Sequence, residues 1–239
     1  MAQDASVIPR SRTVIAELTD SITADPTAIP GPPGDVPVVC QGQAFLVILA
    51  LPGGGAGSAY TAAVLTIGMN ESAAAALHPL RPAAALPGAE LPDELRDKVS
   101  RGVVESEGAL VFGAHRSSGS PTEAIARMGW PDLTHYECQV NSFHLEDHAP
   151  VEVTLLEDGQ PQIGHADQVT LLRLGLAVTD AVCGLVRAAI PGTPIRCIIS
   201  ANDTNGVFRF HRIRSGERWG VHDLDQYRSD MVVTVDDQP

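Results

Sequence analysis

The sequence predicts an α+β fold in which one long buried helix packs on a mostly antiparallel sheet. The main observation is the apolar run 166–190, which contains no proline and matches a helix of about seven turns. A second observation is a set of short apolar or alternating segments, bounded by turn residues, which are typical of strands. We therefore expect residues 38–239 to form a single α+β domain.

The long helix is expected to be buried over most of its circumference. At 100° per residue, Arg173, Asp180 and Arg187 fall on one narrow stripe, and apolar residues cover the rest. That stripe is the part expected to reach solvent, another helix or a subunit partner. Assembly into a homo-oligomer therefore remains open.

The chain from residue 108 onward alternates between strand and helix signals. The expected elements are strands at 108–116, 135–144, 151–157, 195–201, 207–214 and 231–235, and helices at 121–129 and 166–190. Ser120 caps the shorter helix, with Pro121 at its first position. Over 108–214 the order is β-α-β-β-α-β plus one strand, and a split βαβ unit of the ferredoxin-like kind is one solution. The segment 202–206 is expected to close a hairpin.

The N-terminal part is expected to be less regular. Residues 1–37 read as a flexible tail, with a short helix at 13–22 and a proline-rich linker at its end. The apolar run 44–51 predicts a buried strand. The segment 59–69 fits either a helix or the returning strand of a hairpin, and the sequence does not separate these two.

An internal boundary is expected near 80–105, where breaker residues precede a short helix opened by Pro92 and closed near Gly102. The segments that begin at Leu46 and Leu110 echo each other weakly, as strand, Gly/Ser-rich loop and alanine-rich stretch. If that echo is real, the domain divides into two βα-containing halves.

The composition indicates a globular protein without a general affinity for nucleic acid. Hydrophobic residues make up 44% of the chain, and the net charge is −13. That charge excludes general attraction to phosphates or anionic membranes, which comes from an excess of Lys and Arg. The N-terminus lacks the pattern of a signal peptide, so we expect a cytoplasmic protein. Lys98 stands alone against fifteen arginines, a bias usual in high-GC bacterial genomes.

The densest run of reactive side chains lies at 135–148. The catalytic candidates there are Cys138, His144, Glu146 and His148. In an extended segment, His144, Glu146 and His148 share one face. Their spacing is no known zinc signature, so we expect no metal, and the four widely spaced cysteines are read as reduced. Histidine beside carboxylates instead suits acid–base chemistry near neutral pH.

A second cluster is basic, although the chain as a whole is acidic. The binding candidates are Arg209, His211, Arg212 and Arg214. Arginines projecting from a sheet can hold a phosphate or carboxylate with two hydrogen bonds. The alternative is that these arginines pair with acidic residues just downstream, such as Asp223 and Asp225.

The glycine-rich loop at 52–59, ProGlyGlyGlyAlaGlySerAla, resembles the phosphate loop of the GHMP small-molecule kinases. In that family, Pro is followed by a Gly-Leu-Gly-Ser-Ser-Ala core that opens a helix. Here Ala56 replaces the leucine, Ala59 replaces the second serine, and the proline is one residue closer. The resemblance implies a nucleotide phosphate held by backbone N–H groups at a helix N-terminus. Elsewhere the chain has no counterpart of the family's other motifs.

We therefore expect a cytoplasmic bacterial enzyme that acts on a small anionic molecule by histidine-based acid–base chemistry, as an isomerase, cyclase or lyase. His144 or His148 would move the proton, and Arg209, Arg212 or Arg214 would hold the anion. No cofactor, nucleic acid or membrane is expected. The alternatives are a non-catalytic acidic binding or regulatory protein that meets a basic partner, and a degenerate phosphate-loop protein that binds nucleotides.

Overall fold

The computed structural model describes residues 39–41, 44–51, 61–77, 91–116 and 119–238. The expected tail, its helix at 13–22 and the glycine-rich loop at 52–59 lie outside these residues. In the described part, helices combine with antiparallel sheets, which confirms the α+β class with a large antiparallel sheet and one long helix.

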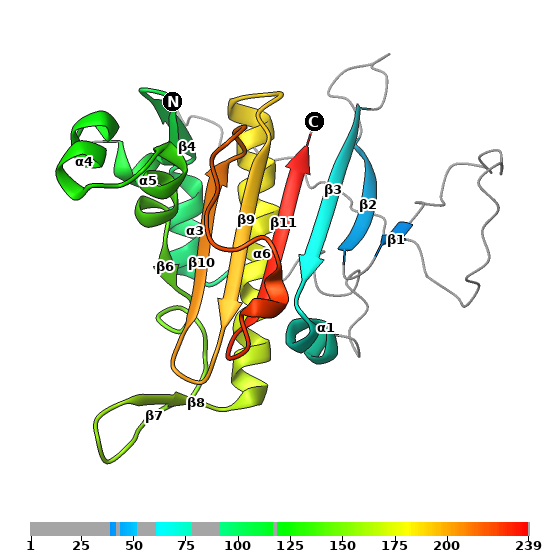
Figure 1. Cartoon of the computed structure of the whole chain (residues 1–239), viewed down its shortest axis with the longest axis vertical. Coiled ribbons are helices and arrows are strands. Elements are labelled where there is room, and N and C mark those ends of the chain that lie inside the picture. The colour runs from blue at the N-terminus through cyan, green and yellow to red at the C-terminus, as the bar shows by residue number, and fades with distance from the viewer. Residues whose placement is uncertain (1–38, 42–43, 52–60, 78–90, 117–118, 239) are drawn as a thin grey trace, which may run out of the picture.

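Seven strands form the main sheet, in the order β1-β2-β3-β11-β9-β10-β6, and every neighbouring pair is antiparallel (Figure 1). The strands are β1 (Val39–Gln41), β2 (Ala44–Leu51), β3 (Thr61–Met69), β6 (Phe143–His144), β9 (Ile195–Ala201), β10 (Gly206–Arg212) and β11 (Met231–Gln238). The segment 59–69, left open between helix and strand, is thus mostly the strand β3. Because β3 pairs with β11, segments on both sides of 80–105 contribute to one sheet.

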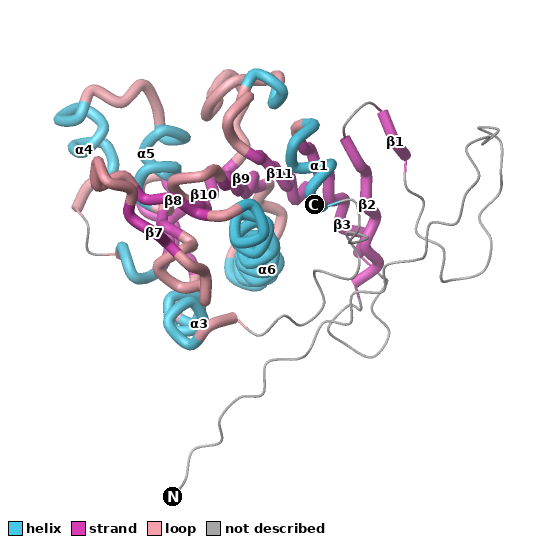
Figure 2. Tube along the Cα trace, turned by 90° about the horizontal axis from the view of Figure 1, so that it is seen from below, coloured by secondary structure: helices cyan, strands magenta, loops and turns pink. Residues whose placement is uncertain are grey.

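The long helix α6 (His165–Ala189) covers the side of the sheet formed by β9, β10 and β11. Figure 2 shows α6 and α3 on one side of this sheet, and α5 at its end on the other side. The close contact depends on Gly175, where a Cβ atom would lie 2.4 Å from Cγ2 of Ile199. α6 is long and apolar enough to cross a membrane, but 61% of its most apolar stretch is buried in this protein. It is the core helix of the domain.

Two of the three residues in the polar stripe of α6 are exposed, as the spacing predicts, and the third contacts the sheet. Arg173 and Asp180 are exposed. Arg187 is partly buried and forms an ion pair with the buried Asp237 of β11, with 2.9 Å between Nε and Oδ2. The end of the stripe therefore ties the helix to the sheet.

The remaining elements flank the main sheet. The helices are α1 (Glu71–Leu77), α3 (Asp93–Ser100), α4 (Pro121–Met128) and α5 (Leu133–Val140), and two hairpins are formed by β4 (Val103–Ser106) with β5 (Ala109–Phe112) and by β7 (Val153–Leu155) with β8 (Pro161–Ile163). Short 3₁₀ turns occur at Gly113–His115 and Leu224–Gln226. The cap of α4 is as expected, because the Ser120 side chain accepts a hydrogen bond from the N–H of Glu123.

The predicted strand at 135–144 is wrong. Most of it is the helix α5, capped by Asp132, whose Oδ1 accepts from the N–H of His135 at 2.8 Å. Only Phe143 and His144 are extended. The buried Thr134, Cys138 and Asn141 follow helical spacing, which the alternation of polar residues obscured.

Two further strands are shorter than expected and leave the main sheet. The strand expected at 108–116 is β5, paired only with β4, and the one at 151–157 is β7, paired only with β8. From residue 108 to 214 the order is therefore β-α-α-β-β-β-α-β-β instead of β-α-β-β-α-β plus one strand. The segment after the glycine-rich loop is the strand β3, so the helix implied by the weak internal echo is absent there.

Candidate functional site

A large groove lies on the face of the sheet opposite α6. Its volume is about 1220 Å³, and its floor is formed by β3, β9, β10 and β11. The connection between β10 and β11 crosses in front of this face and forms one wall (Figure 1). His135 and Gln139 of α5 line another side.

The floor of the groove is more polar than the opposite face of the same strands. Period two places Arg196, Ile198 and Ser200 of β9 toward the groove, while the intervening residues are fully or almost fully buried against α6. On β10, Val207 and Arg209 alternate in the same way. Arg196 is neutralised by Asp236 of β11, through two hydrogen bonds of 2.6 and 2.7 Å.

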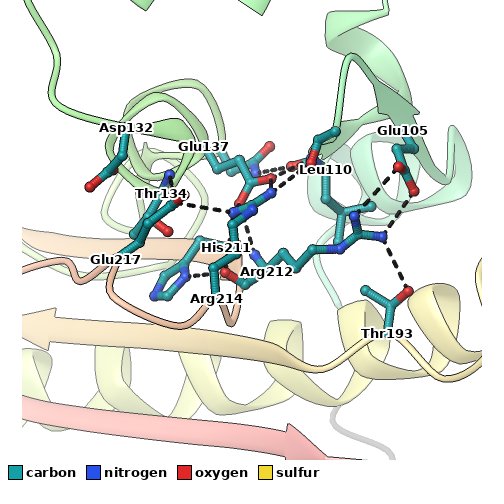
Figure 3. A network of polar contacts seen from close by, with 12 residues as sticks. Glu105, Leu110, Asp132, Thr134, Glu137, Thr193, His211, Arg212, Arg214 and Glu217 are labelled. Atoms are coloured by element: carbon teal, nitrogen blue, oxygen red, sulfur yellow. Dashed lines mark hydrogen bonds and ion pairs between the residues drawn. The ribbon is translucent and has the colours of Figure 1, made fainter.

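Next to the groove, α5 places the fully buried carboxylate of Glu137 between two strand edges (Figure 3). Its oxygens accept from the backbone N–H of Leu110 in β5 and from that of Arg212 in β10. The guanidinium of Arg214 donates to both oxygens, at 2.6 and 2.9 Å. The Glu137 carboxylate thus accepts hydrogen bonds from backbone N–H groups at two strand edges, and Arg214 balances its negative charge.

Asn141 lies one helical turn after Glu137 in α5, and its side chain links the same two strands, β5 and β10. Its amide group donates to the carbonyl oxygens of Leu110 and Phe210 and accepts from the N–H of Phe112. β6 pairs only with Val207 and Phe208, so α5 side chains complete the edge of β10 beyond that point.

Two of the four binding candidates therefore have structural partners. Arg214 holds Glu137, and Arg212 forms an ion pair with Glu105 of β4, with 2.9 Å between Nη2 and Oε2. These two carboxylates come from α5 and β4, far away in the sequence. A downstream carboxylate, that of Glu217, lies further from Arg214, with 3.8 Å between Oε2 and Nη1.

Arg209 differs from both of these arginines. Its guanidinium lies over the indole ring of Trp219, 5.5 Å from the ring centroid, and it lines the groove. Burial lowers the pKa of Arg209, although the group remains a cation at neutral pH. The sequence favours core filling for Trp219, because nothing local distinguishes a ring that lines a groove from one that fills a core.

A comparison among arginines makes Arg209 the distinctive one. In the described part of the chain, five arginines are partly buried, and four of them form an ion pair with a carboxylate. Those four are Arg187, Arg196, Arg212 and Arg214. Arg209 is the fifth, and no described side chain neutralises it.

Three histidines line the groove, namely His135, His144 and His222, and a carboxylate orients each of the first two. The Nδ1 atom of His144 lies 2.8 Å from Oε1 of Glu146, whose other oxygen accepts from the N–H of Gly206. The Nδ1 atom of His135 lies 2.8 Å from Oδ1 of Asp132, and its ring packs on Trp219 with 5.2 Å between centroids. A carboxylate at Nδ1 fixes the proton there and leaves Nε2 as the basic atom of each ring. His135 was in the reactive run but was not among the candidates.

The other candidates lie away from the groove lining. His148 bonds Glu94 of α3 and packs against Phe143, so it does not share a site with His144. Cys138 is fully buried in α5, and burial raises the pKa of its thiol, which keeps the group protonated at neutral pH.

His211 is also almost fully buried. Its Nδ1 donates to the carbonyl oxygen of Arg212 at 2.8 Å, while Nε2 has no hydrogen-bond partner within the described residues (Figure 3). Burial, the largest effect, lowers the pKa of His211 and favours the neutral ring.

Carboxylates also line the groove. Asp230 accepts from the side-chain amide of Asn202 at 2.6 Å, and Asp225 accepts from the N–H of Glu71 at 2.9 Å. Over the residues the structure covers, no three His, Cys, Asp or Glu side chains come together in a metal-binding arrangement.

The comparisons with known proteins identify a family match over part of the chain. A model of the uncharacterized protein PM0498 family matches residues 72–158, which is less than half of the chain. That segment contains α5 and β6, with Glu137 and His144, but it ends before α6 and before Arg209. None of the curated proteins matches the chain. No solved structure matches it either.

Proposed function

We propose that the groove binds a small anionic molecule at Arg209 and that His144 moves a proton on that molecule. The protein would then be a cytoplasmic enzyme of the isomerase, cyclase or lyase type. The observation that carries this proposal is the partly buried guanidinium of Arg209 in a groove, which no carboxylate of the described residues neutralises. A cation partly removed from water gains most from an anion that enters beside it.

The position of His144 supports the catalytic part of the proposal. His144 of β6 pairs directly with Val207 of β10. Arg209 lies two residues after Val207 on the same strand. Both side chains therefore project from the same face, at a diagonal spacing of about 7–8 Å between Cα atoms. An anion held at Arg209 would present its neighbouring carbon or oxygen to Nε2 of His144.

The histidine would act as a general base and then as a general acid. Nε2 takes a proton from the bound molecule, the resulting imidazolium is stabilised by Glu146, and the same proton is returned at another atom or to a leaving group. His135, oriented by Asp132, would serve the opposite step. The proposal therefore retains His144, Glu146 and Arg209 from the sequence hypothesis, and it adds His135.

Binding is tested with inorganic phosphate and malonate as probes, by isothermal titration calorimetry of the whole chain. We expect Arg209→Gln to weaken binding by about tenfold to a hundredfold, the range for losing a charge-assisted contact. The matched control is Arg127→Gln, which removes an exposed arginine of α4 and should leave binding unchanged. Equal binding by wild type and Arg209→Gln would refute the anchor.

Chemistry is tested separately, by proton NMR in D₂O with a panel of 2-oxo and 2-hydroxy carboxylic acids. An acid–base enzyme exchanges a carbon-bound hydrogen of its substrate for deuterium, at C2 of a 2-hydroxy acid or at C3, beside the ketone, of a 2-oxo acid. We expect His144→Gln to slow that exchange by about 10²–10⁴-fold while anion binding persists. His148→Gln, outside the groove, is the control.

A non-catalytic binding protein is the second candidate. The groove volume of about 1220 Å³ exceeds the roughly 300–1000 Å³ usual for small-molecule sites, which favours a larger ligand. Anion binding that depends on Arg209, with no exchange on any acid of the panel and no effect of His144→Gln, would select this candidate. The phosphate-loop alternative is weakened, because a strand and not a helix N-terminus follows residues 52–59.

A further inference from the structure

The hairpin β7–β8 exposes more large apolar side chains than any other described element. Every residue from 152 to 160 is exposed, and the exposed fraction is 42% for Val153, 74% for Leu155 and 44% for Leu156. The hairpin projects away from the main sheet and pairs with no other strand in the part of the chain that the structure describes (Figure 1). A lone two-stranded ribbon gains little stability in water, so such exposed apolar residues point to a further contact.

The outer edge of β7 also has free backbone groups. The N–H of Ile163 donates to the carbonyl of Asp203, away from β7, so the pair formed by Val153 and Ile163 is not hydrogen-bonded across the hairpin. The N–H of Leu156 does donate across the hairpin, to Gln160. By alternation, the N–H and C=O groups of Val153 and Leu155 point outward from β7.

These two features coincide at the same residues. Val153 and Leu155 lie two apart, so their side chains project from one face of the ribbon, while their backbone groups point to its open edge. Thr154, between them, is directed to the other face and donates to the carbonyl of Gln162. An extended segment added at this edge would gain main-chain hydrogen bonds and two apolar contacts.

The charge around the edge selects the partner. Glu152, Glu157 and Asp158 flank it, and residues 149–164 contain neither lysine nor arginine. A second copy of this hairpin would bring like charges together, which is unfavourable. A strand with alternating basic and apolar residues would instead place its cations beside these carboxylates.

We propose that the β7 edge is a docking site for an extended, basic and apolar segment of another protein, which binds by strand addition. The surface lies outside the groove, so it would serve to recruit or regulate and not to hold the substrate. The proposal is independent of the function assigned to the groove.

The test uses a fluorescently labelled, capped peptide of alternating lysine and valine, added to the full chain and followed by fluorescence anisotropy. We expect saturable binding that weakens at least about tenfold in the variant Val153→Thr with Leu155→Thr. Threonine keeps the strand propensity, so the hairpin should persist. The matched control is Met128→Thr, which removes an exposed apolar side chain from α4.

A second peptide decides whether the backbone is recognised. N-methylation of alternate residues keeps the charge and side chains but removes the N–H groups that pair with β7, and it should abolish binding. Equal binding of the methylated peptide, or of the double variant, would overturn the proposal. A wild-type dimer in sedimentation that dissociates in the double variant would also overturn it, in favour of pairing between two copies.

Discussion

Arg209 and Arg214 lie five residues apart, yet the structure gives them opposite environments. Arg214 donates to both oxygens of the fully buried Glu137 and to the carbonyl of Gly108. Arg209 lies on Trp219 at the groove, and no carboxylate among the described residues forms an ion pair with it. A local excess of arginine therefore does not define a binding site. The location of the carboxylates decides which arginine remains available to a ligand.

The two arginines are expected to contribute differently to the free energy of unfolding, because removing only one of them leaves a buried charge unpaired. Without Arg214, the carboxylate of Glu137 would remain inside the protein as an unpaired charge. Without Arg209, no buried anion would lose its partner. Breaking one side of a buried ion pair is far more costly than removing a cation that faces a groove.

The strongest test of this comparison is the same substitution at both positions. We expect Arg214→Met to lower the free energy of unfolding by about 3–5 kcal/mol. Arg209→Met should change it by less than about 1 kcal/mol, because the lost contact with Trp219 is offset by relief of burial. Urea unfolding followed by circular dichroism measures both. Similar losses for the two variants would show that Arg209 is structural as well.

The elements that could be predicted from the sequence are those whose signals are local. The helix α6 follows from an unbroken apolar run, and α4 from Ser120 and Pro121 at its start. The hairpin β9–β10 follows from two apolar segments around a polar loop. Each of these elements would be recognised in isolation, because its stabilising contacts lie close together in the chain.

The helix α5 and the site could not be predicted in the same way. Glu137 is buried in α5 because Arg214, 77 residues later, neutralises it. The groove likewise combines Arg209 with Trp219 and with two histidines from α5 and β6. The sequence presented reactive residues in two clusters, but only the fold separates Arg209 from Arg214, and His144 from His148.

His211 is buried near Arg214, and unlike that arginine it is neutral at pH 7. Burial lowers its pKa, with smaller opposing effects of Glu137 and Asp236 and a further lowering by Arg196. Below pH about 6.5, the unfolded chain then binds the proton more readily than the folded one, so stability falls as the pH falls. We expect His211→Gln to flatten this slope, by at most about 1.4 kcal/mol per pH unit. Parallel stability profiles between pH 5 and 8 for the two proteins would contradict it.

A comparison with Arg212 shows how much of the stability lost in Arg214→Met is due to burial of the ion pair. Its guanidinium pairs with Glu105, whose side chain is partly exposed, while its backbone N–H belongs to the Glu137 network. A substitution of the side chain leaves that backbone bond intact. In a double-mutant cycle of Arg212→Met and Glu105→Gln, we expect a coupling of only about 0.2–1 kcal/mol, as for exposed ion pairs. A coupling as large as that between Arg214 and Glu137 would mean that bidentate geometry, and not burial, determines the strength of these pairs.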